Sequence, residues 1–289
     1  MIAHDGLDLN GDVRLTQKHD CEALEIELLL QGIYHRYGFD YREYQRDPLK
    51  AKVRALLATH NVPSISALQD RILHDSGVMD AVLVELTGRK GLLFEDPEYV
   101  KQMRQTAIPW LRSHPSPKIW IANCVSAEEV CSVAILLEEE GIYAKSAIFA
   151  TGANENLLRA ASSGGIDRDR FDQGAANHLL SGGTATLSRY FEQDGDRLIL
   201  LPHLRANITW AQFNLQTDAS FNEFQLIVCR KVLGDFGAAL QHRTLRLFHE
   251  SLSMFGMLGV DNSAEIEPAP FCNWFKDVSA HGNLYKRVA

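Results

Sequence analysis

Hydrophobic positions recur at helical spacing in the first third of the chain. From residue 22 to about residue 88, apolar side chains repeat every three or four positions, and no run that alternates like a strand interrupts them. The pattern predicts helices over Leu24–Tyr34, Ala51–His60 and Ser64–His74, with Ser64 as an N-cap. We therefore expect a small helical domain at residues 22–88, preceded by a flexible tail at residues 1–21.

After a linker at residues 89–100, the pattern changes to strands that alternate with helices. Short apolar runs of the kind that form buried strands are separated by amphipathic segments. Such alternation predicts a mostly parallel sheet with helices on both faces, here over residues 101–289. The predicted strands are Lys118–Ala122, Ser146–Thr151 and Phe224–Cys229, a further strand starts at Gly256–Gly259, and the helices are Ser126–Gly141, Asn154–Ala161 and Ala239–Leu252.

Residues 162 to about 212 do not follow this alternation. Gly-rich turn sequences there surround short strand-like pieces such as Arg197–Leu201. An excursion of this length without regular structure is uncommon in a compact domain. We therefore expect a small β subdomain inserted into the α/β domain.

The segment Lys118–Gly141 combines a strand, a tight loop and a helix. Ser126 and Glu129 have the spacing of a capping box, which starts a helix. This is the usual place for an α/β protein to bind a nucleotide-like cofactor, and close approach of the ligand favours glycine there. Asn123 and Ala127 stand where the ligand would need room. The sequence therefore predicts the fold of a cofactor-binding segment but lacks the glycines that such binding favours.

Composition narrows the class of protein. The chain has 289 residues, of which 46% are apolar and 23% charged, as is typical of a soluble globular protein. Five scattered cysteines indicate reduced thiols rather than a disulfide framework or a zinc site. The net charge of −8 disfavours nucleic-acid binding, and no apolar run is long enough to span a bilayer. We expect a cytoplasmic protein without membrane insertion or a metal.

Several segments in a fixed order carry a resemblance to a known family. They are LTGRKGLLFEDPEYV (86–100), WIANCVSAEEVCSVAILLEE (120–139), IFATGANENLLRAASSG (148–164), LIVCRKVLGDF (226–236), LQHRTLRLFHESL (240–252) and GMLGV (256–260). Over roughly residues 22–289 the chain resembles the chemotaxis receptor methyltransferases, the CheR family. The resemblance implies a Rossmann-like methyltransferase sheet with an inserted β subdomain, after an all-helical N-terminal domain. It also implies methyl transfer from S-adenosylmethionine to glutamate side chains of chemoreceptors.

The resemblance also implies cofactor-binding positions, and many of them have changed. Five family positions are kept, Glu128, Glu129, Asn214, Leu215 and Arg230, and all but Glu128 are candidates to bind the cofactor. Glu95 stands where the family has an arginine for the cofactor carboxylate, and Gly152 where it has an aspartate for the ribose. The full set of replacements expected around the pocket is Arg89, Glu95, Asn123, Ala127, Gly152, Lys231 and Asp235.

These replacements predict weak binding of the cofactor. Each lost charged hydrogen bond costs about 1.5–3 kcal/mol. A combined loss of about 4–8 kcal/mol would turn a micromolar site into a millimolar one or worse. We therefore expect a degenerate homologue, a pseudoenzyme with no catalytic residues and no cofactor, that acts by binding in bacterial chemosensory or related signalling. In this hypothesis Glu95 pairs with Lys231 or Arg230 and closes the cavity; the simpler interpretation is that these charges are solvated.

Two other functions stay open. The first is an active protein-glutamate O-methyltransferase with a rebuilt site for S-adenosylmethionine and its product S-adenosylhomocysteine, in which Arg89 or Arg230 meets the carboxylate and Glu129 meets the ribose or amino group. The second is a pocket for an anionic nucleotide, attracted by Arg89, Arg230 and Lys231.

A protein partner, a chemoreceptor or another signalling protein, is also implied by the resemblance, since the family uses a basic helix near the N-terminus to meet acidic receptor helices. Opposite charges of this kind steer and orient two proteins that associate. The alternative is a solvated helix face of mixed charge. The candidate partner-binding residues are Arg42, Arg46, Lys50, Lys52 and Arg54.

Overall fold

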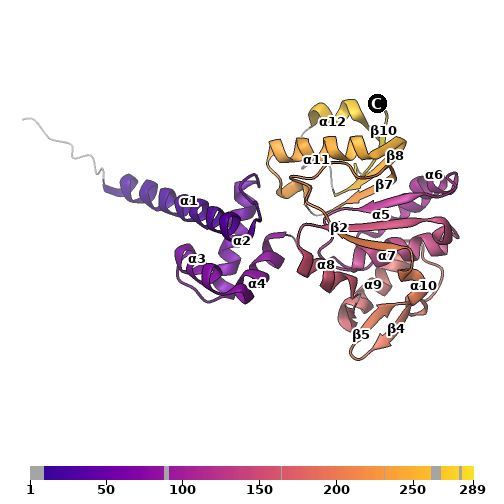
Figure 1. Cartoon of the computed structure of the whole chain (residues 1–289), viewed down its shortest axis with the longest axis horizontal. Coiled ribbons are helices and arrows are strands. Elements are labelled where there is room, and N and C mark those ends of the chain that lie inside the picture. The colour runs from indigo at the N-terminus through magenta and orange to yellow at the C-terminus, as the bar shows by residue number, and fades with distance from the viewer. Residues whose placement is uncertain (1–9, 88–90, 164, 231, 262–267, 280–281) are drawn as a thin grey trace, which may run out of the picture. The chain divides into compact units, whose positions relative to one another are not determined.

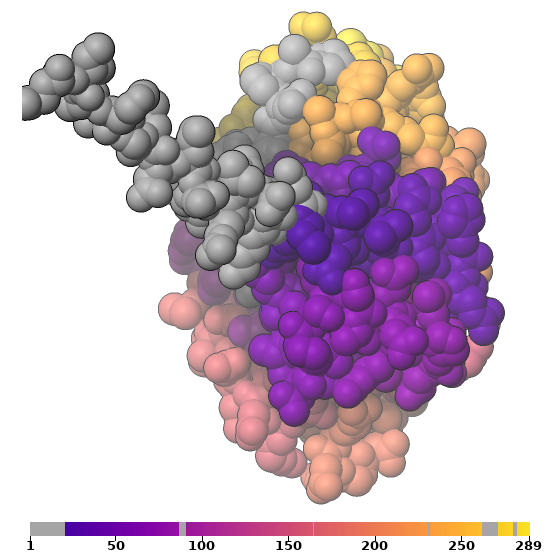
Figure 2. Space-filling model, turned by 90° about the vertical axis from the view of Figure 1, so that its left-hand side faces the viewer, coloured from indigo at the N-terminus to yellow at the C-terminus, as the bar shows by residue number. Residues whose placement is uncertain are grey.

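The computed structural model describes residues 10–87, 91–163, 165–230, 232–261, 268–279 and 282–289. It divides into two compact units, Met1–Leu86 and Thr87–Ala289. The first unit is helical, and Figure 2 shows its surface in indigo to purple. Its elements are α1 (Asn10–Tyr37), α2 (Arg46–Thr59), α3 (Ile65–His74) and α4 (Ser76–Thr87).

The helical unit confirms the predicted class of structure and corrects one boundary. Ser64 caps α3, because its hydroxyl accepts a hydrogen bond from the Ala67 N–H at 3.2 Å. Helix α1 begins at Asn10, so the prediction of a tail is wrong for residues 10–21. No proline or glycine follows Gly11 in that stretch, so the helix extends toward the N-terminus from the part whose Leu29 and Ile33 are buried.

The second unit contains a seven-stranded sheet with the order β6-β2-β1-β7-β8-β10-β9 (Figure 1). The first five strands are parallel to one another, and β10 runs antiparallel to both β8 and β9. This is the predicted Rossmann-like methyltransferase sheet. The strands are β1 (Lys118–Ile121), β2 (Ala147–Gly152), β6 (Ile208–Gln212), β7 (Phe224–Cys229), β8 (Leu252–Val260), β9 (Phe275–Asp277) and β10 (Leu284–Arg287).

Helices cover both faces of this sheet, with α7 on one face and α11 and α12 on the other (Figure 1). The alternation along β1 fits both layers: Ile119 and Ile121 join the core cluster that includes α7, whereas the Trp120 ring lies 5.4 Å from Phe248 of α11. The helices are α5 (Pro97–Gln102), α6 (Ile108–Arg112), α7 (Glu128–Glu139), α8 (Glu155–Ser162), α9 (Arg168–Leu180), α10 (Pro202–Arg205), α11 (Ala238–Ser251) and α12 (Pro268–Trp274). A π-helical turn, Met103–Ala107, joins α5 to α6, and short 3₁₀ turns lie at Tyr143–Lys145, Leu187–Tyr190 and Leu233–Asp235.

The inserted region forms a small antiparallel sheet of three strands with the order β3-β5-β4. Helix α9 follows β3 in the chain and precedes β4. The predicted extent of the insertion, to residue 212, is too long, because β6 pairs with β2 and belongs to the large sheet. The strands are β3 (Ile166–Asp167), β4 (Phe191–Asp194) and β5 (Arg197–Leu200).

Within the described residues, every helix is too short or too polar to cross a bilayer.

Two tryptophans give a test of the sheet core. Trp120 is fully buried, and its indole N–H donates to the Thr151 hydroxyl at 2.7 Å. We predict that Trp120→Phe lowers the free energy of unfolding by about 2–4 kcal/mol, through the lost hydrogen bond and the cavity that remains. Urea unfolding measures this change.

Trp110→Phe is the matched control. The indole N–H of Trp110 is buried without a hydrogen-bond partner among the described residues, so its removal should cost less than about 1 kcal/mol. Equal losses for the two variants would contradict the role given to the bond between Trp120 and Thr151.

Candidate functional site

The loops that follow β1, β2 and β7 meet at one edge of the large sheet. Parallel neighbouring strands end at the same edge, which is where open α/β sheets bind ligands. The loop after β1 spans residues 122–127, the β2 end carries Gly152, and Arg230 follows β7. The linker segment Gly91–Asp96 contributes a further wall.

The loop after β1 keeps a glycine-like shape without glycine. Asn123 has φ of 56°, a left-handed conformation that asparagine tolerates better than most residues. The predicted capping box is wrong: α7 begins at Glu128, its N-cap is Ala127, and no side chain caps it. Glu129 lines a cavity and acts electrostatically on Arg230, so its carboxylate serves the site rather than the helix start.

The end of β2 has no room for the ribose-binding aspartate of the resembling family. A Cβ added to Gly152 would lie 2.8 Å from the carbonyl oxygen of Cys124. The Cys124 N–H in turn donates to the Thr151 carbonyl at 2.7 Å, which holds the loop in that place. A side chain at position 152 therefore requires the loop after β1 to move.

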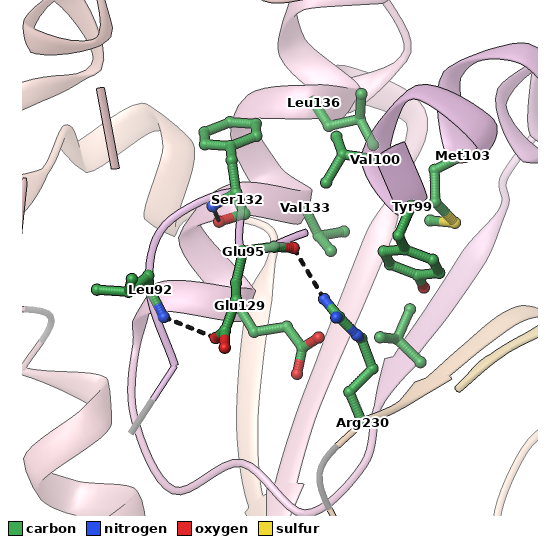
Figure 3. Close-up of a pocket in the computed structure, with 12 residues that line it drawn as sticks. Leu92, Glu95, Tyr99, Val100, Met103, Glu129, Ser132, Val133, Leu136 and Arg230 are labelled. Atoms are coloured by element: carbon green, nitrogen blue, oxygen red, sulfur yellow. Dashed lines mark hydrogen bonds between the residues drawn. The ribbon is translucent and has the colours of Figure 1, made fainter. Parts of the chain in front are cut away.

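A cavity of about 30 Å³ lies between the linker, α5, α7 and β7 (Figure 3). Its walls are mostly apolar, and Glu95, Glu129, Ser132 and Arg230 supply the polar groups. A space of this size accommodates a water molecule and is far smaller than a usual ligand pocket of about 300–1,000 Å³. The other lining residues are Leu92, Phe94, Tyr99, Val100, Met103, Val133, Leu136 and Val228.

Arg230 is a buried cation that joins the linker to the sheet. Its side chain is 9% exposed, and its guanidinium donates to the Glu95 main-chain oxygen at 3.0 Å. Asp261 lies 3.2 Å and Asp96 3.7 Å away, and the Tyr99 ring centre is 4.5 Å from the guanidinium carbon. Burial disfavours the charge, but the surrounding acidic groups outweigh burial and raise the pKa of Arg230 above its ordinary value. Arg230 is therefore a fixed positive charge.

The predicted ion pair between Arg230 and the Glu95 carboxylate is not formed. The Glu95 carboxylate accepts a hydrogen bond from the Leu92 N–H at 2.9 Å, and Arg230 bonds only the main chain of Glu95 (Figure 3). The short span between Leu92 and Glu95 lets the side chain close its own loop. Lys231 and Arg89 lie outside the described residues, so a pair between Glu95 and Lys231 stays a prediction.

The two adjacent glutamates at the start of α7 serve different partners. Glu129 faces the cavity, whereas the buried Glu128 pairs with Arg170 of α9 at 2.8 Å. Successive side chains on a helix point about 100° apart, which explains the division. The nearby Cys124 and Cys229 are buried thiols, and burial raises the pKa of each well above its ordinary value, which disfavours a nucleophilic role.

Six other predicted site residues that the structure describes do not line this cavity. Asn123 and Ala127 belong to the loop after β1 and Gly152 to the end of β2, and the remaining three lie elsewhere. Asn214 accepts the Gln216 N–H at 2.9 Å in the turn after β6, and Leu215 is buried beside it. Asp235 ends the 3₁₀ turn after β7. The structure therefore brings together Glu95, Glu129 and Arg230, but not these six, around the cavity.

The predicted partner-binding residues lie at or just before α2, and most are paired within the helical unit. Glu22 accepts both Lys50 and Arg54 at 2.8 Å, and these hydrogen bonds, with Arg54 the stronger influence, lower the pKa of Glu22 to about 2. Arg46 and Lys50 line a groove of about 300 Å³ between α1 and α2. The others contact neighbours: Arg42 pairs with Asp40 at 2.7 Å, and Lys52 donates to the Leu86 carbonyl at 3.4 Å.

Sequence reasoning missed three contributors to the site. Tyr99 packs under Arg230, the Ser132 hydroxyl accepts the Phe94 N–H at 2.8 Å, and Arg170 holds Glu128. Of these three residues, only Ser132 could have been found from the sequence, because it lies one helical turn after Glu128. Arg170 lies in a charged run, which favours an exposed loop. Its pairing with Glu128 becomes visible only in the folded structure.

Comparison with known proteins defines the class. The family description "CheR methyltransferase, SAM binding domain" matches residues 90–281, and "CheR methyltransferase, all-alpha domain" matches residues 24–87. Together these matches cover most of the chain. The chain belongs to the CheR methyltransferase family, as its sequence motifs predict.

Individual relatives support the same family assignment. "Putative methyltransferase Cher3" of Pseudomonas putida is 35% identical over 264 residues, which cover 91% of this chain and 97% of the relative. A "Chemotaxis protein methyltransferase" of Listeria monocytogenes is 24% identical and covers 81% and 87%. Among solved structures, the N-methyltransferase NodS of Bradyrhizobium japonicum with S-adenosyl-l-homocysteine matches at a TM-score of 0.36 and 8% identity. The match covers 67% of this chain and 90% of that one, and a likeness this low does not indicate function.

A buried polar cluster lies at the other end of α7. Glu139 accepts hydrogen bonds from His178 Nε2 at 2.7 Å, from the Tyr190 hydroxyl at 3.1 Å and from Arg104. Burial raises the pKa of Glu139, but the bonds from His178 and Arg104 outweigh it, so the pKa lies below its ordinary value of 4.5. The ionised form therefore stabilises the fold.

This shift predicts a pH dependence of stability. A carboxyl with a lowered pKa in the folded state stabilises above its unfolded pKa and loses that contribution as the pH falls. Glu139→Gln should cost about 3 kcal/mol near neutral pH, and the difference from wild type should shrink below pH 4.5. Urea unfolding from pH 7 to pH 3 measures it. The exposed Glu138→Gln is the control, and a difference for Glu139→Gln that stays constant across this range would contradict the assignment.

Proposed function

We propose that this protein is a CheR-type methyltransferase that transfers the methyl group of S-adenosylmethionine to glutamate side chains of a signalling protein, with a rebuilt cofactor site. The observation that supports this most is that Glu129 and Arg230 line the same cavity on the ligand-binding edge of the sheet and act on each other electrostatically. A carboxylate and a guanidinium are complementary to the ammonium and carboxylate of the donor's methionine end.

The remaining residues partly fit this donor. Asn123 keeps the left-handed turn of the loop after β1, so the backbone shape that admits a ligand is retained. Arg230 would hold the carboxylate in place of the arginine that Glu95 replaces, and Glu129 would hold the ammonium. Gly152 offers no side chain to the ribose, and the ribose would be held by main-chain groups of the surrounding loops.

The chemistry asks little of the protein beyond positioning. S-adenosylmethionine supplies an electrophilic methyl group. A glutamate side chain is ionised near neutral pH and accepts that group without first losing a proton, so the site needs no general base. The missing catalytic residue in the sequence is therefore compatible with activity.

The family supports a proposal for the partner and the location. Relatives in Listeria and Pseudomonas carry the name chemotaxis protein methyltransferase, which supports a protein substrate of the chemoreceptor kind. The groove between α1 and α2 offers Arg46 and Lys50 to an acidic partner, beside the acidic Glu27 and Asp47 that also line it. We propose a cytoplasmic location, where such a substrate would present its glutamates.

A second function, binding without catalysis, is favoured by two observations. The Cys124 carbonyl occupies the space beside Gly152, and Glu95 places a negative charge near the position of the donor carboxylate. A regulator that kept the fold and lost the donor would look like this. The same titration separates the two functions.

The test is calorimetric titration with S-adenosylhomocysteine and S-adenosylmethionine. We expect micromolar binding to wild type. Glu129→Gln should weaken binding by about 10- to 150-fold, because one charged hydrogen bond contributes about 1.5–3 kcal/mol. Glu138→Gln, on the exposed side of the same helix, should leave the affinity unchanged.

No heat with either compound, from protein whose thermal unfolding shows it to be folded, would reject the methyltransferase and favour the regulator. Equal affinities of wild type and Glu129→Gln would reject the assignment of Glu129 alone.

A further inference from the structure

The linker that forms one wall of the cavity is held in an unfavourable conformation. Phe94 has φ of 51° and Asp96 has φ of 60°, both in the left-handed region. For a bulky residue such as phenylalanine this region is an outlier, and it persists only where the surroundings impose it. Phe94 is fully buried, so the constraint comes from packed neighbours.

One face of α9 supplies that constraint. Arg170 donates to the Gly91 carbonyl, and the Asn177 amide donates to the Leu93 carbonyl at 3.2 Å. Gly174 lies so close to the linker that an added Cβ would be 2.5 Å from the Cβ of Leu93. The His178 ring lies 4.6 Å from the Phe94 ring. These four α9 residues are spaced i, i+4, i+7 and i+8, so they share one side of the helix.

Helix α7 holds the linker from the other side. The Ser132 hydroxyl accepts the Phe94 N–H, and Glu128, one turn earlier, pairs with the same Arg170 that holds Gly91. The Arg170 guanidinium therefore connects three segments: α9, the start of α7 and the linker. The next residue along α7 is Glu129, whose carboxylate lines the cavity.

We propose that α9 of the inserted region sets the shape of the ligand cavity by gripping linker residues 91–95, with Arg170 as a positioning residue for the ligand. The inserted region is then part of the binding site's support, although none of its residues lines the cavity described above. The ligand used in the second test rests on the proposed function, whereas the contacts of α9 with linker residues 91–95 do not depend on it.

The first measurement is hydrogen exchange of the linker in ligand-free protein. Arg170→Gln should speed exchange at the amides of residues 92–96 by about tenfold, as the loss of one charged hydrogen bond predicts. Arg168→Gln is the matched control, an exposed arginine two positions earlier on the same helix. Unchanged hydrogen exchange of the linker amides in Arg170→Gln would overturn the proposal that α9 holds the linker.

The second measurement is the affinity for S-adenosylhomocysteine. Arg170→Gln should weaken it by about tenfold, and Arg168→Gln should leave it as in wild type. The double variant Arg170→Gln/Glu128→Gln removes the charge left unpaired in the single variant and should regain stability. It should not regain affinity, because the bond to the Gly91 carbonyl is still missing. Recovery of affinity together with stability would reduce Arg170 to a structural ion pair and overturn the positioning role.

A further variant covers the case in which Arg170→Gln does not fold. Gly174→Ala pushes on Leu93 directly and keeps the ion pair, so it should displace the linker and weaken binding while Glu128 stays neutralised. Wild-type affinity in this variant would overturn the proposal. If wild type binds neither S-adenosylhomocysteine nor S-adenosylmethionine, the proposed function fails, and hydrogen exchange alone decides whether α9 holds the linker.

Discussion

A buried positive charge at Arg230 is the constraint on which the site depends. A guanidinium removed from water must be neutralised and hydrogen-bonded. Asp96 on the linker and Asp261 after β8 pair with it, Glu129 at the start of α7 adds a further negative charge, and the Glu95 carbonyl and the Tyr99 ring complete the shell. Satisfying one side chain therefore fixes the linker against the end of the sheet, and it leaves Glu129 as the carboxylate that lines the remaining space.

Much of the fold can be predicted from the sequence, because the patterns that specify its helices and strands are local. The strand Phe224–Cys229 is an unbroken apolar run buried on both faces, and its predicted limits agree with the structure. Ser64 caps its helix as its position predicts. The errors are local as well. The start of α1 has no distinctive signal, and β6 pairs with β2 across more than fifty residues, a contact that turn-rich sequence before it conceals.

The site was less predictable, because its chemistry depends on which way side chains turn. The resemblance to the family places Glu95 at the cofactor carboxylate. In the structure the Glu95 carboxylate instead turns back to the Leu92 N–H, so the change of sign is accommodated. The pair between Glu128 and Arg170 joins residues 42 positions apart, and no spacing rule reveals such a contact. Capping rules assign Glu129 to the helix start, whereas the nearby buried cation attracts it into the cavity.

Asn123 shows that the geometry of a ligand loop and its glycine signature can be inherited separately. The backbone there turns as a glycine would, yet the residue brings an amide group that glycine lacks. A search keyed only to the glycines of this loop would miss it, whereas its torsion angles keep the turn recognisable. The backbone conformation of the loop is therefore retained although the residue that usually provides it is gone.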